Sequence, residues 1–301
     1  MRKCKIELRN ILLIIFITAQ PDHPTKQQII HTLDNSHIPF EVLHPSISWW
    51  GLRKKLRNAP NPLCLLAPDH PRIFYLSKLL SNTDFRIVNS SEITLLCKNR
   101  ISISLRIQQL LSQYKRNHPT APLYIPDPRY FKNPNQLGIS LDLSDFPIVI
   151  KYPNNHTGIH YVNMKQAHEL DTIPRFFKKC GLYVEKYVEA TDILLKCYNF
   201  GEEVITQQES NRQSLYRALN STPETYKSRK HRITIETPIE IEAFTHYISK
   251  ELGVLLFGMD FLITEDNNYW LVDFNDFPGA RGIENAGEII ASSLIKQMKN
   301  T

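Results

Sequence analysis

Short apolar runs and helix-like segments alternate through the first hundred residues of this 301-residue chain. The β-branched-rich runs at 11–18, 39–44 and 63–67 predict buried strands, and the segments at 24–36 and 71–81 predict helices. Strands separated by whole helices pair in parallel, because each helix carries the chain back along the sheet. This alternation predicts an α/β lobe with a parallel sheet. No Gly-x-Gly-x-x-Gly follows the first strand, so we expect no dinucleotide site there.

The composition is that of an ordinary globular protein. Hydrophobic residues make up 42% of the chain and charged residues 22%, which excludes disordered and fibrous classes. A chain of 301 residues exceeds what one hydrophobic core usually serves, so we expect two or three lobes. Lys and Arg exceed Asp and Glu by 36 to 30. This mild positive charge favours anionic ligands, and we expect no nucleic-acid partner.

Residues 1–19 allow two interpretations. MRKCKIELRN followed by ILLIIFITA has the basic and short apolar regions of a secretory signal peptide. The alternative, which we adopt, is a buried first strand closed by the turn-like Gln20-Pro21-Asp22. The five cysteines are scattered and form no Cys-x-x-Cys pair, so we expect a reducing, cytoplasmic location. No apolar run reaches the roughly 18–20 residues of a membrane span, so no membrane partner is expected.

The middle of the chain changes from alternating strands and helices to a β-rich pattern. Residues 86–116 predict a strand and then a long amphipathic helix capped by Ser90 or Ser91. A Pro-rich connector at 119–134 indicates a domain boundary. The polar, basic stretch at 207–234 is typical of a long surface loop. Around it we expect strands at 146–152, 182–188 and 192–206 and helices near 165–180 and at 240–253.

Two apolar runs near the C-terminus predict an antiparallel hairpin with acidic side chains. VLLFGMDFLI and YWLVDFND flank the turn-forming residues Thr264–Asn268. Pairing across this turn sets Asp260 opposite residue 272 or Asp273, and Asn275 shares a face with Asp273 because side chains alternate along a strand. Two carboxylates and an amide oxygen on one face are a ligand set suited to Mg²⁺. The alternative is that each aspartate merely ends a strand.

Two lysines interrupt apolar strands. Lys151 follows FPIVI, and Lys196 lies in ILLKCYNFGE. An ammonium in an apolar strand needs a counter-anion, such as a nucleotide phosphate; alternatively, each lysine extends to solvent. In the polar turn PNNHTGIHYV, His156 and His160 are candidates for substrate or acid–base contacts, although loop histidines are often inert. Glu185 in LYVEKYV is a candidate hinge residue against adenine and ribose, the alternative being a solvated glutamate at a strand end.

Positive charge gathers in two further places. The segment Lys227–Arg232 is the densest basic cluster and can recruit an anionic substrate, unless it is simply a solvated face. Arg281 follows the Pro-Gly turn and is a candidate for binding a substrate carboxylate or phosphate. Asp276 falls on the opposite strand face from Asn275, so we leave it out of the metal site.

These motifs, in this order, resemble those of the ATP-grasp superfamily. FPIVIKY resembles its phosphate-binding strand, LYVEKYV its adenine hinge, LKCYNFGEE its next basic strand, and LFGMDFLI with LVDFNDFPG its two metal-ligand strands. IVNSSEITLLCKNR resembles the segment that carries an ATP-binding lysine, a position that Arg100 occupies here. The resemblance implies Mg²⁺ or Mn²⁺ at Asp260, Asp273 and Asn275. It implies ATP contacts from Arg100, Lys151, Glu185, Lys196 and the backbone of Tyr187 and Val188.

The resemblance also implies the fold and its division. We expect an α/β protein that becomes α+β in its C-terminal part, with an ATP-grasp fold behind a parallel-sheet lobe. The expected domains are an N-terminal α/β domain at 1–88, a central ATP-grasp subdomain at 89–183 and a C-terminal subdomain with the metal site at 184–301.

Two enzyme classes of this superfamily remain open. Carboxylate–amine ligases similar to the ribosomal-protein glutamate ligases match the NSS segment at 89–91; in them ATP phosphorylates a carboxylate and an amine captures the acyl phosphate. ATP-grasp inositol polyphosphate kinases match DFNDFPG, the two loop histidines and ILLK, where Leu194 stands in place of the ligases' usual Asp. We favour the ligase because the N-terminal alternation also resembles that class.

A third interpretation is an ATP-binding regulatory protein with degraded catalysis, suggested by Arg100 and the glycine-poor phosphate loop. The ligase interpretation implies carboxylate and amine substrates, either small molecules or peptides. It assigns Arg232, Arg281 and His160 to substrate contacts or catalysis. Self-association into a homo-oligomer stays open.

Overall fold

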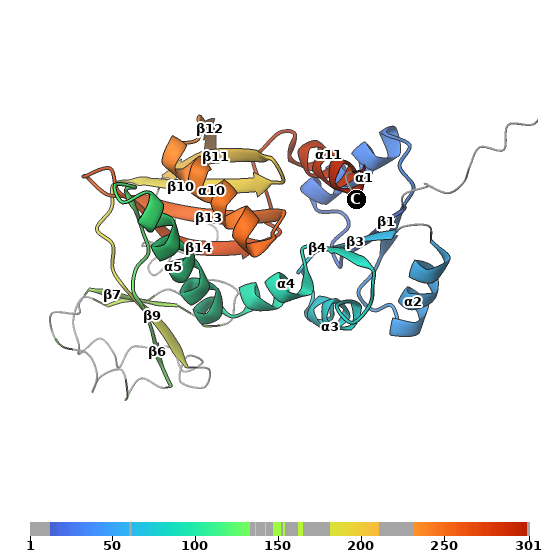
Figure 1. The fold of residues 1–301 in the computed structure, drawn as a ribbon, viewed down its shortest axis with the longest axis horizontal. Helices are drawn as coiled ribbons and strands as arrows, with labels where there is room; N and C mark the ends of the chain where they lie inside the picture. Colours follow the sequence, from blue (N-terminus) through green and yellow to red (C-terminus); the bar gives the residue numbers. More distant parts are fainter. Residues whose placement is uncertain are drawn as a thin grey trace, which may run out of the picture.

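A computed structural model describes most of the chain. The described residues are 13–59, 62–132, 136, 142, 147–151, 153, 162–164, 181–210 and 232–299. They form three β-sheets with helices packed against them (Figure 1). Several predicted features lie outside these residues: the start of the chain, both loop histidines His156 and His160, the helix near 165–180, and the basic cluster except Arg232.

The predicted parallel sheet is confirmed. Its strands are β1 (Leu13–Ile17), β2 (Phe40–Leu43), β3 (Pro62–Leu66) and β4 (Arg86–Val88), in the spatial order β2-β1-β3-β4 and all parallel. Helices α1 (Pro24–Asn35), α2 (Trp49–Asn58) and α3 (Pro71–Leu80) connect them. Ile14 to Ile17 are fully buried, which fits a parallel sheet with both faces covered.

The helical segment after β4 differs from the prediction. We expected one long helix, but the chain forms α4 (Ser91–Lys98) and α5 (Arg100–Asn117). Ser90 caps α4 as predicted, its Oγ accepting from the Ile93 N–H at 3.3 Å. Asn99 between the helices is extended (φ −102°, ψ 107°), and its Oδ1 accepts from the Ser102 N–H at 3.1 Å. Asn99 therefore acts as a second helix cap, a role for which the short amide side chain is well suited.

The central sheet has six strands. Its order is β12 (Arg232–Ile235), β11 (Glu203–Ser210), β10 (Ile193–Phe200), β13 (Leu256–Ile263), β14 (Tyr269–Asp276) and β5 (Leu123–Tyr124). All pairs are antiparallel except β14 with β5. Helices α5 and α10 (Ile239–Leu252) pack on this sheet through a shared apolar core.

The expected loop at 207–234 is corrected at both ends. Gln207–Ser210 belongs to β11, and β12 starts at Arg232 and pairs with β11. The expected strand at 192–206 is in fact a hairpin that turns at Gly201, whose φ of +77° favours glycine. β12 gave no apolar signal because it is an edge strand with partly exposed side chains.

A third, four-stranded sheet stands beside the central one. Its order is β6 (Pro128–Phe131), β9 (Leu182–Lys186), β7 (Ile148–Lys151) and β8 (Val162–Met164), and every pair is antiparallel. The Pro-rich connector thus contributes β5 to one sheet and β6 to another. The division at 88 and 183 stays a prediction.

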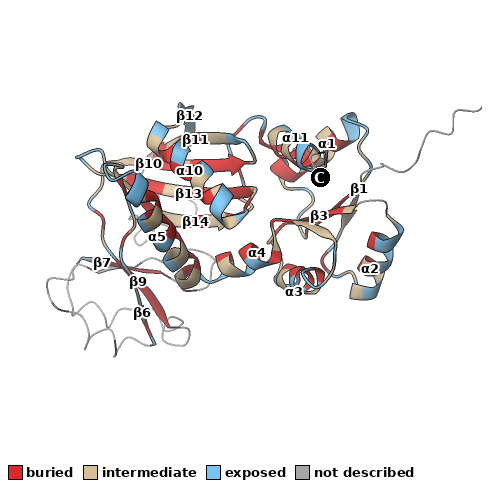
Figure 2. Cartoon of the chain, viewed as in Figure 1, coloured by how far each residue is buried: buried red, intermediate tan, exposed pale blue. Residues whose placement is uncertain are grey.

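The C-terminal helix returns to the N-terminal sheet. Helix α11 (Ala286–Lys299) lies beside α1, far from it in sequence (Figure 1). Ile290 and Leu294 of α11 share a buried core with Ile14 and Phe16 of β1 and with Phe200 of β10. Figure 2 shows α11 and α1 side by side, each with buried and exposed segments. Among the described helices, none has the length and apolar character needed to cross a membrane.

Candidate active site

The β13–β14 hairpin positions the predicted metal ligands as expected. Asp260 pairs directly with Asp273 across the hairpin. Asn275 donates through Nδ2 to Asp273 Oδ2 at 2.8 Å, so all three side chains meet on one face. A β-bulge between Asp260 and Phe261 leaves Val272 outside the regular pairing, because a bulge sets two residues of one strand against one of the other.

Each carboxylate of the hairpin has a cationic partner. Lys196 Nζ lies 2.5 Å from Asp260 Oδ2, and Arg100 Nη1 lies 3.2 Å from Asp273 Oδ1. Burial raises the pKa of Asp260, with the Asp273 charge adding to the effect. Burial acts in the same direction on Asp273, but the charges of Arg100, Lys151 and Lys196 and the hydrogen bond from Asn275 together outweigh it and lower the pKa of Asp273. The two facing carboxyl groups therefore differ in proton affinity: Asp260 binds a proton more readily than an ordinary aspartate, and Asp273 less readily.

Lys151 lies at the centre of a second buried network. Its ammonium forms an ion pair with Glu185, and it donates to the Val272 carbonyl at 2.7 Å. The bulge thus supplies an acceptor for this lysine. Tyr183 donates to Glu185 and lies 2.9 Å from Ser104 Oγ. Burial lowers the pKa of Lys151 despite its carboxylate partner.

These contacts rule out the solvent-exposed alternatives for Lys151 and Glu185. Their side chains are only 4% and 5% exposed, so neither extends to solvent. The residues predicted to form the hinge lie just beyond: Tyr187 donates its N–H to the Pro147 carbonyl at 3.0 Å, and Val188 packs against Leu194. Tyr183 was not predicted as part of this network, because a tyrosine in an apolar strand is ordinarily a core residue.

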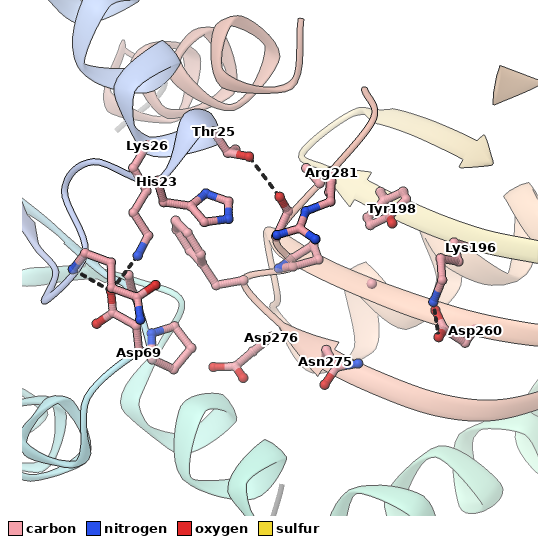
Figure 3. A pocket seen from close by; sticks show the side chains of 18 of the residues that line it. His23, Thr25, Lys26, Asp69, Lys196, Tyr198, Asp260, Asn275, Asp276 and Arg281 are labelled. Atoms are coloured by element: carbon pink, nitrogen blue, oxygen red, sulfur yellow. Dashed lines mark hydrogen bonds and ion pairs between the residues drawn. The ribbon is translucent and has the colours of Figure 1, made fainter. Parts of the chain in front are cut away.

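A cavity of about 420 Å³ opens beside the hairpin, between the central sheet and the N-terminal sheet (Figure 3). From the central sheet and the loop after it come Lys196, Asp260, Asn275, Asp276 and Arg281, among others. Asp276, which strand alternation places on the opposite face from Asn275 and which we left out of the metal site, also lines this cavity.

The two predicted arginines have different surroundings. Arg232 Nε lies 2.7 Å from Glu209 Oε2, and its Nη1 donates to the Arg281 carbonyl at 2.9 Å. Arg232 therefore fixes the loop that carries Arg281. Arg281 itself stands between Ala280 (φ 42°) and Gly282 (φ 90°), two left-handed residues that turn the chain sharply. Within the described part of the chain, its guanidinium forms no ion pair or hydrogen bond.

The N-terminal sheet supplies the other wall of the cavity, which was not predicted from the sequence. Lys26 Nζ lies 2.5 Å from Asp69 Oδ2 and 2.9 Å from Thr18 Oγ1. Asp69 also accepts from the Thr18 hydroxyl at 2.5 Å and from the Ala19 N–H at 3.0 Å. His23 lies in front of this cluster. The available signal was the position of these polar residues directly after β1 and β3.

The oxygen atoms on the hairpin fit a hard divalent cation. Asp260 and Asp273 face each other, and the amide oxygen of Asn275 remains available when its nitrogen donates to Asp273. Lys196 and Arg100 now supply the positive charge that a cation would supply. No group of three His, Cys, Asp or Glu side chains in the described ranges is placed to hold a metal ion. The ligand set that the hairpin itself offers is therefore the two aspartates and the amide oxygen of Asn275.

Solved structures share this architecture. An ATP-grasp RimK domain protein from Sphaerobacter thermophilus superposes with a TM-score of 0.63 at 15% identity, covering 94% of this chain and 99% of that one. The macrocyclase MdnC from Microcystis aeruginosa, bound to its precursor peptide MdnA, gives 0.65 at 12% identity, with 94% and 99% covered. The ATP-grasp ligase PsnB, complexed with a phosphomimetic variant of its minimal precursor, Mg and ADP, gives 0.64 at 15% identity, with 96% and 98% covered.

The chain therefore has the ATP-grasp fold, as its motifs predicted. The likeness extends over nearly the whole length of both chains, so it includes the N-terminal sheet as well as the central one. The sequence itself matches no protein-family model and no curated protein.

Proposed function

We propose that this protein is an ATP- and Mg²⁺-dependent ligase that joins a carboxylate to an amine. The observation that carries the proposal is the meeting of Asp260, Asp273, Lys196, Arg100 and Lys151 around one hairpin that borders a cavity. The similar solved structures that are described as ligases, one of them holding Mg and ADP, support the same assignment.

The proposed reaction has two steps. A carboxylate oxygen of the first substrate attacks the γ-phosphorus of ATP, the bond to the bridging oxygen breaks, and ADP leaves. The nitrogen of an amine then attacks the acyl phosphate carbon, inorganic phosphate leaves, and the amine loses a proton. Bound Mg²⁺ would neutralise phosphate charge in the first step.

The residues of this chain would act by positioning and by charge rather than as nucleophiles. Asp260, Asp273 and Asn275 would hold Mg²⁺. Lys151, Lys196 and Arg100 would turn from carboxylate partners to phosphate oxygens, with adenine against the segment at 185–188 that includes Glu185, Tyr187 and Val188. Arg281 would contact the substrate and Arg232 would hold its loop; His160 is retained as a candidate from the sequence alone. We also retain the division into domains at 1–88, 89–183 and 184–301.

The first test replaces a metal ligand. We expect Asp273→Asn to lower Mg-dependent ATP turnover by about 10²- to 10³-fold, the loss typical of removing one preorganised charged or polar group. Asp266→Asn is the matched control, because Asp266 is exposed in the turn of the same hairpin. Circular dichroism of both variants checks that the fold is intact. Equal turnover in Asp273→Asn and Asp266→Asn would remove the metal assignment.

The products distinguish the reaction classes. Phosphorus NMR of the protein with ATP, Mg²⁺ and pools of acids and amines should show ADP and inorganic phosphate, and mass spectrometry of the same mixture should show a new amide. A phosphorylated product without inorganic phosphate would instead indicate a kinase. ATP binding without ADP formation in every pool would indicate a regulatory protein.

A further inference from the structure

The cavity coincides with a switch point of the N-terminal sheet. β1 and β3 are neighbours, but the chain leaves β1 towards β2 on one side and leaves β3 towards β4 on the other. In open parallel sheets, ligands bind in the crevice outside the carboxyl ends of two such strands. Gln20 and His23 follow β1, and Pro68 and Asp69 follow β3, and all four line the cavity. Topology and cavity position thus indicate the same site.

Most charges on the cavity wall are already neutralised by partners. Lys26 pairs with Asp69, and Lys196 pairs with Asp260. Arg281 differs, since no described residue accepts from its guanidinium, and Figure 3 shows it directed across the cavity beside His23. An arginine in such a position has donors to spare for an anionic group, which it can hold through two parallel hydrogen bonds.

His23 adds a second polar group at the same end. Its Nδ1 is buried and has no hydrogen-bond partner among the described residues. Burial lowers the pKa of His23, and the neighbouring Lys26 and Arg281 charges lower it further, so the neutral imidazole can donate one N–H. The Thr25 hydroxyl donates to the Gly279 carbonyl at 2.8 Å and holds the His23 and Arg281 segments together.

We propose that Arg281 and His23 form a subsite for a carboxylate that does not react. The amine-bearing substrate would accordingly be a free amino acid or a short peptide, held by its terminal carboxylate. A volume of about 420 Å³ is near the small end for ligand pockets and suits a molecule of that size. This inference rests on the proposed ligase function, because it assigns the second substrate of that reaction.

The position of the subsite separates the two carboxylates of the reaction. Figure 3 shows the Lys196–Asp260 pair farther along the central sheet, away from His23 and Arg281. The carboxylate to be phosphorylated belongs at the Lys196–Asp260 end, next to the metal ligands. A carboxylate at the His23–Arg281 end directs the amine of the same molecule towards that centre.

The test is binding, so that it does not depend on turnover. Wild-type protein with Mg–ADP is titrated with the proteinogenic amino acids and three dipeptides, and with the C-terminal amide of each, using ligand-observed NMR. We expect at least one free acid to bind, and its amide to bind about 10- to 100-fold more weakly, the range for loss of a charge-assisted contact. Arg281→Met should weaken binding of the free acid by a similar factor and leave binding of the amide unchanged. His23→Ala should weaken binding of the free acid by a smaller factor.

Controls separate this inference from the proposed function. Arg57→Met removes an exposed arginine of α2 that does not line the cavity, and it should bind the acid like wild type. A fluorescent ADP analogue with Mg²⁺ reports nucleotide binding in every variant. Failure of the wild type to bind nucleotide would refute the ligase proposal. If the nucleotide binds normally, three results would refute the carboxylate subsite alone. These are that no free acid binds, that the amides bind as well as the free acids, or that Arg281→Met does not change binding of the acid.

Discussion

Asn89 ties the N-terminal sheet to the central sheet and gives the sharpest prediction about stability. Its side chain is 3% exposed and lies just after β4. Nδ2 donates to the Leu256 carbonyl at 2.6 Å, and Oδ1 accepts from the Leu255 and Leu256 N–H groups at 3.1 and 3.0 Å. One side chain thus serves three backbone groups at the start of β13, 167 residues away for Leu256.

Asn89→Ala would leave the Leu255 and Leu256 N–H groups without their acceptor, whereas the Leu256 carbonyl keeps the Phe277 N–H as a donor at 3.1 Å. At about 1–3 kcal/mol for each buried group left unsatisfied, the sum for the two N–H groups is about 2–6 kcal/mol. We expect the lower half, about 2–4 kcal/mol, because a water molecule entering the vacated space can restore part of the bonding. With a urea m-value of about 3 kcal/mol per M, the unfolding midpoint should fall by about 0.7–1.3 M.

The assay combines urea unfolding with hydrogen exchange. Exchange of the Leu255 and Leu256 amides should accelerate in Asn89→Ala more than exchange elsewhere in β13, because these amides lose their acceptor. Asn35→Ala is the control, since Asn35 is exposed at the end of α1. Midpoints equal within error for the two variants, with unchanged exchange at Leu255 and Leu256, would refute the reasoning.

Two further predictions concern the junction of the lobes. Gly287→Ala should lower the melting temperature, because a Cβ at this position would lie 2.1 Å from Gln28 Cβ and 2.6 Å from the Ile29 nitrogen. Overpacking of this kind costs about 1–3 kcal/mol, which corresponds to a decrease of about 3–10 °C. Gly279→Ala is the control, since a Cβ at that position meets no atom within 4 Å; equal melting temperatures would contradict the close helix contact. At pH values above its ordinary pKa of about 3.9, Asp69 should stabilise the fold. The reason is that hydrogen bonds from Lys26, Thr18 and Ala19 outweigh the effect of burial and lower the pKa of Asp69 in the folded state. This stabilisation is lost as the pH falls through the lowered pKa, so the urea midpoints of wild type and Asp69→Asn should converge in acid. A difference between the two midpoints that stays constant from pH 7 to pH 2 would contradict this prediction.

The sequence alone determined the elements whose signals are local. Alternation of apolar runs with helical segments predicted the parallel sheet, and the turn at Thr264–Asn268 with period-two alternation predicted Asp260 opposite Asp273. Lys151 and Lys196 stood out because a charge in an apolar strand requires a partner. The prediction of one long helix was wrong at Asn99, because the same local sequence also allows a helix cap. Asn99 caps the new helix α5 instead of continuing α4.

Only the tertiary structure decided what closes the site. Lys26 and Asp69 are 43 residues apart, and Thr25 and Gly279 are 254 apart, so no periodicity in the sequence could connect them. Arg232 was visible as a charge, but its partner Glu209 and its hold on the Arg281 carbonyl appear only when β12 pairs with β11. Periodicity sets the face on which a side chain lies, whereas packing of distant segments determines which other face it meets. In this protein periodicity was enough to predict the hairpin that carries the proposed metal ligands, whereas only packing brought together the cavity wall of His23, Asp69 and Arg281.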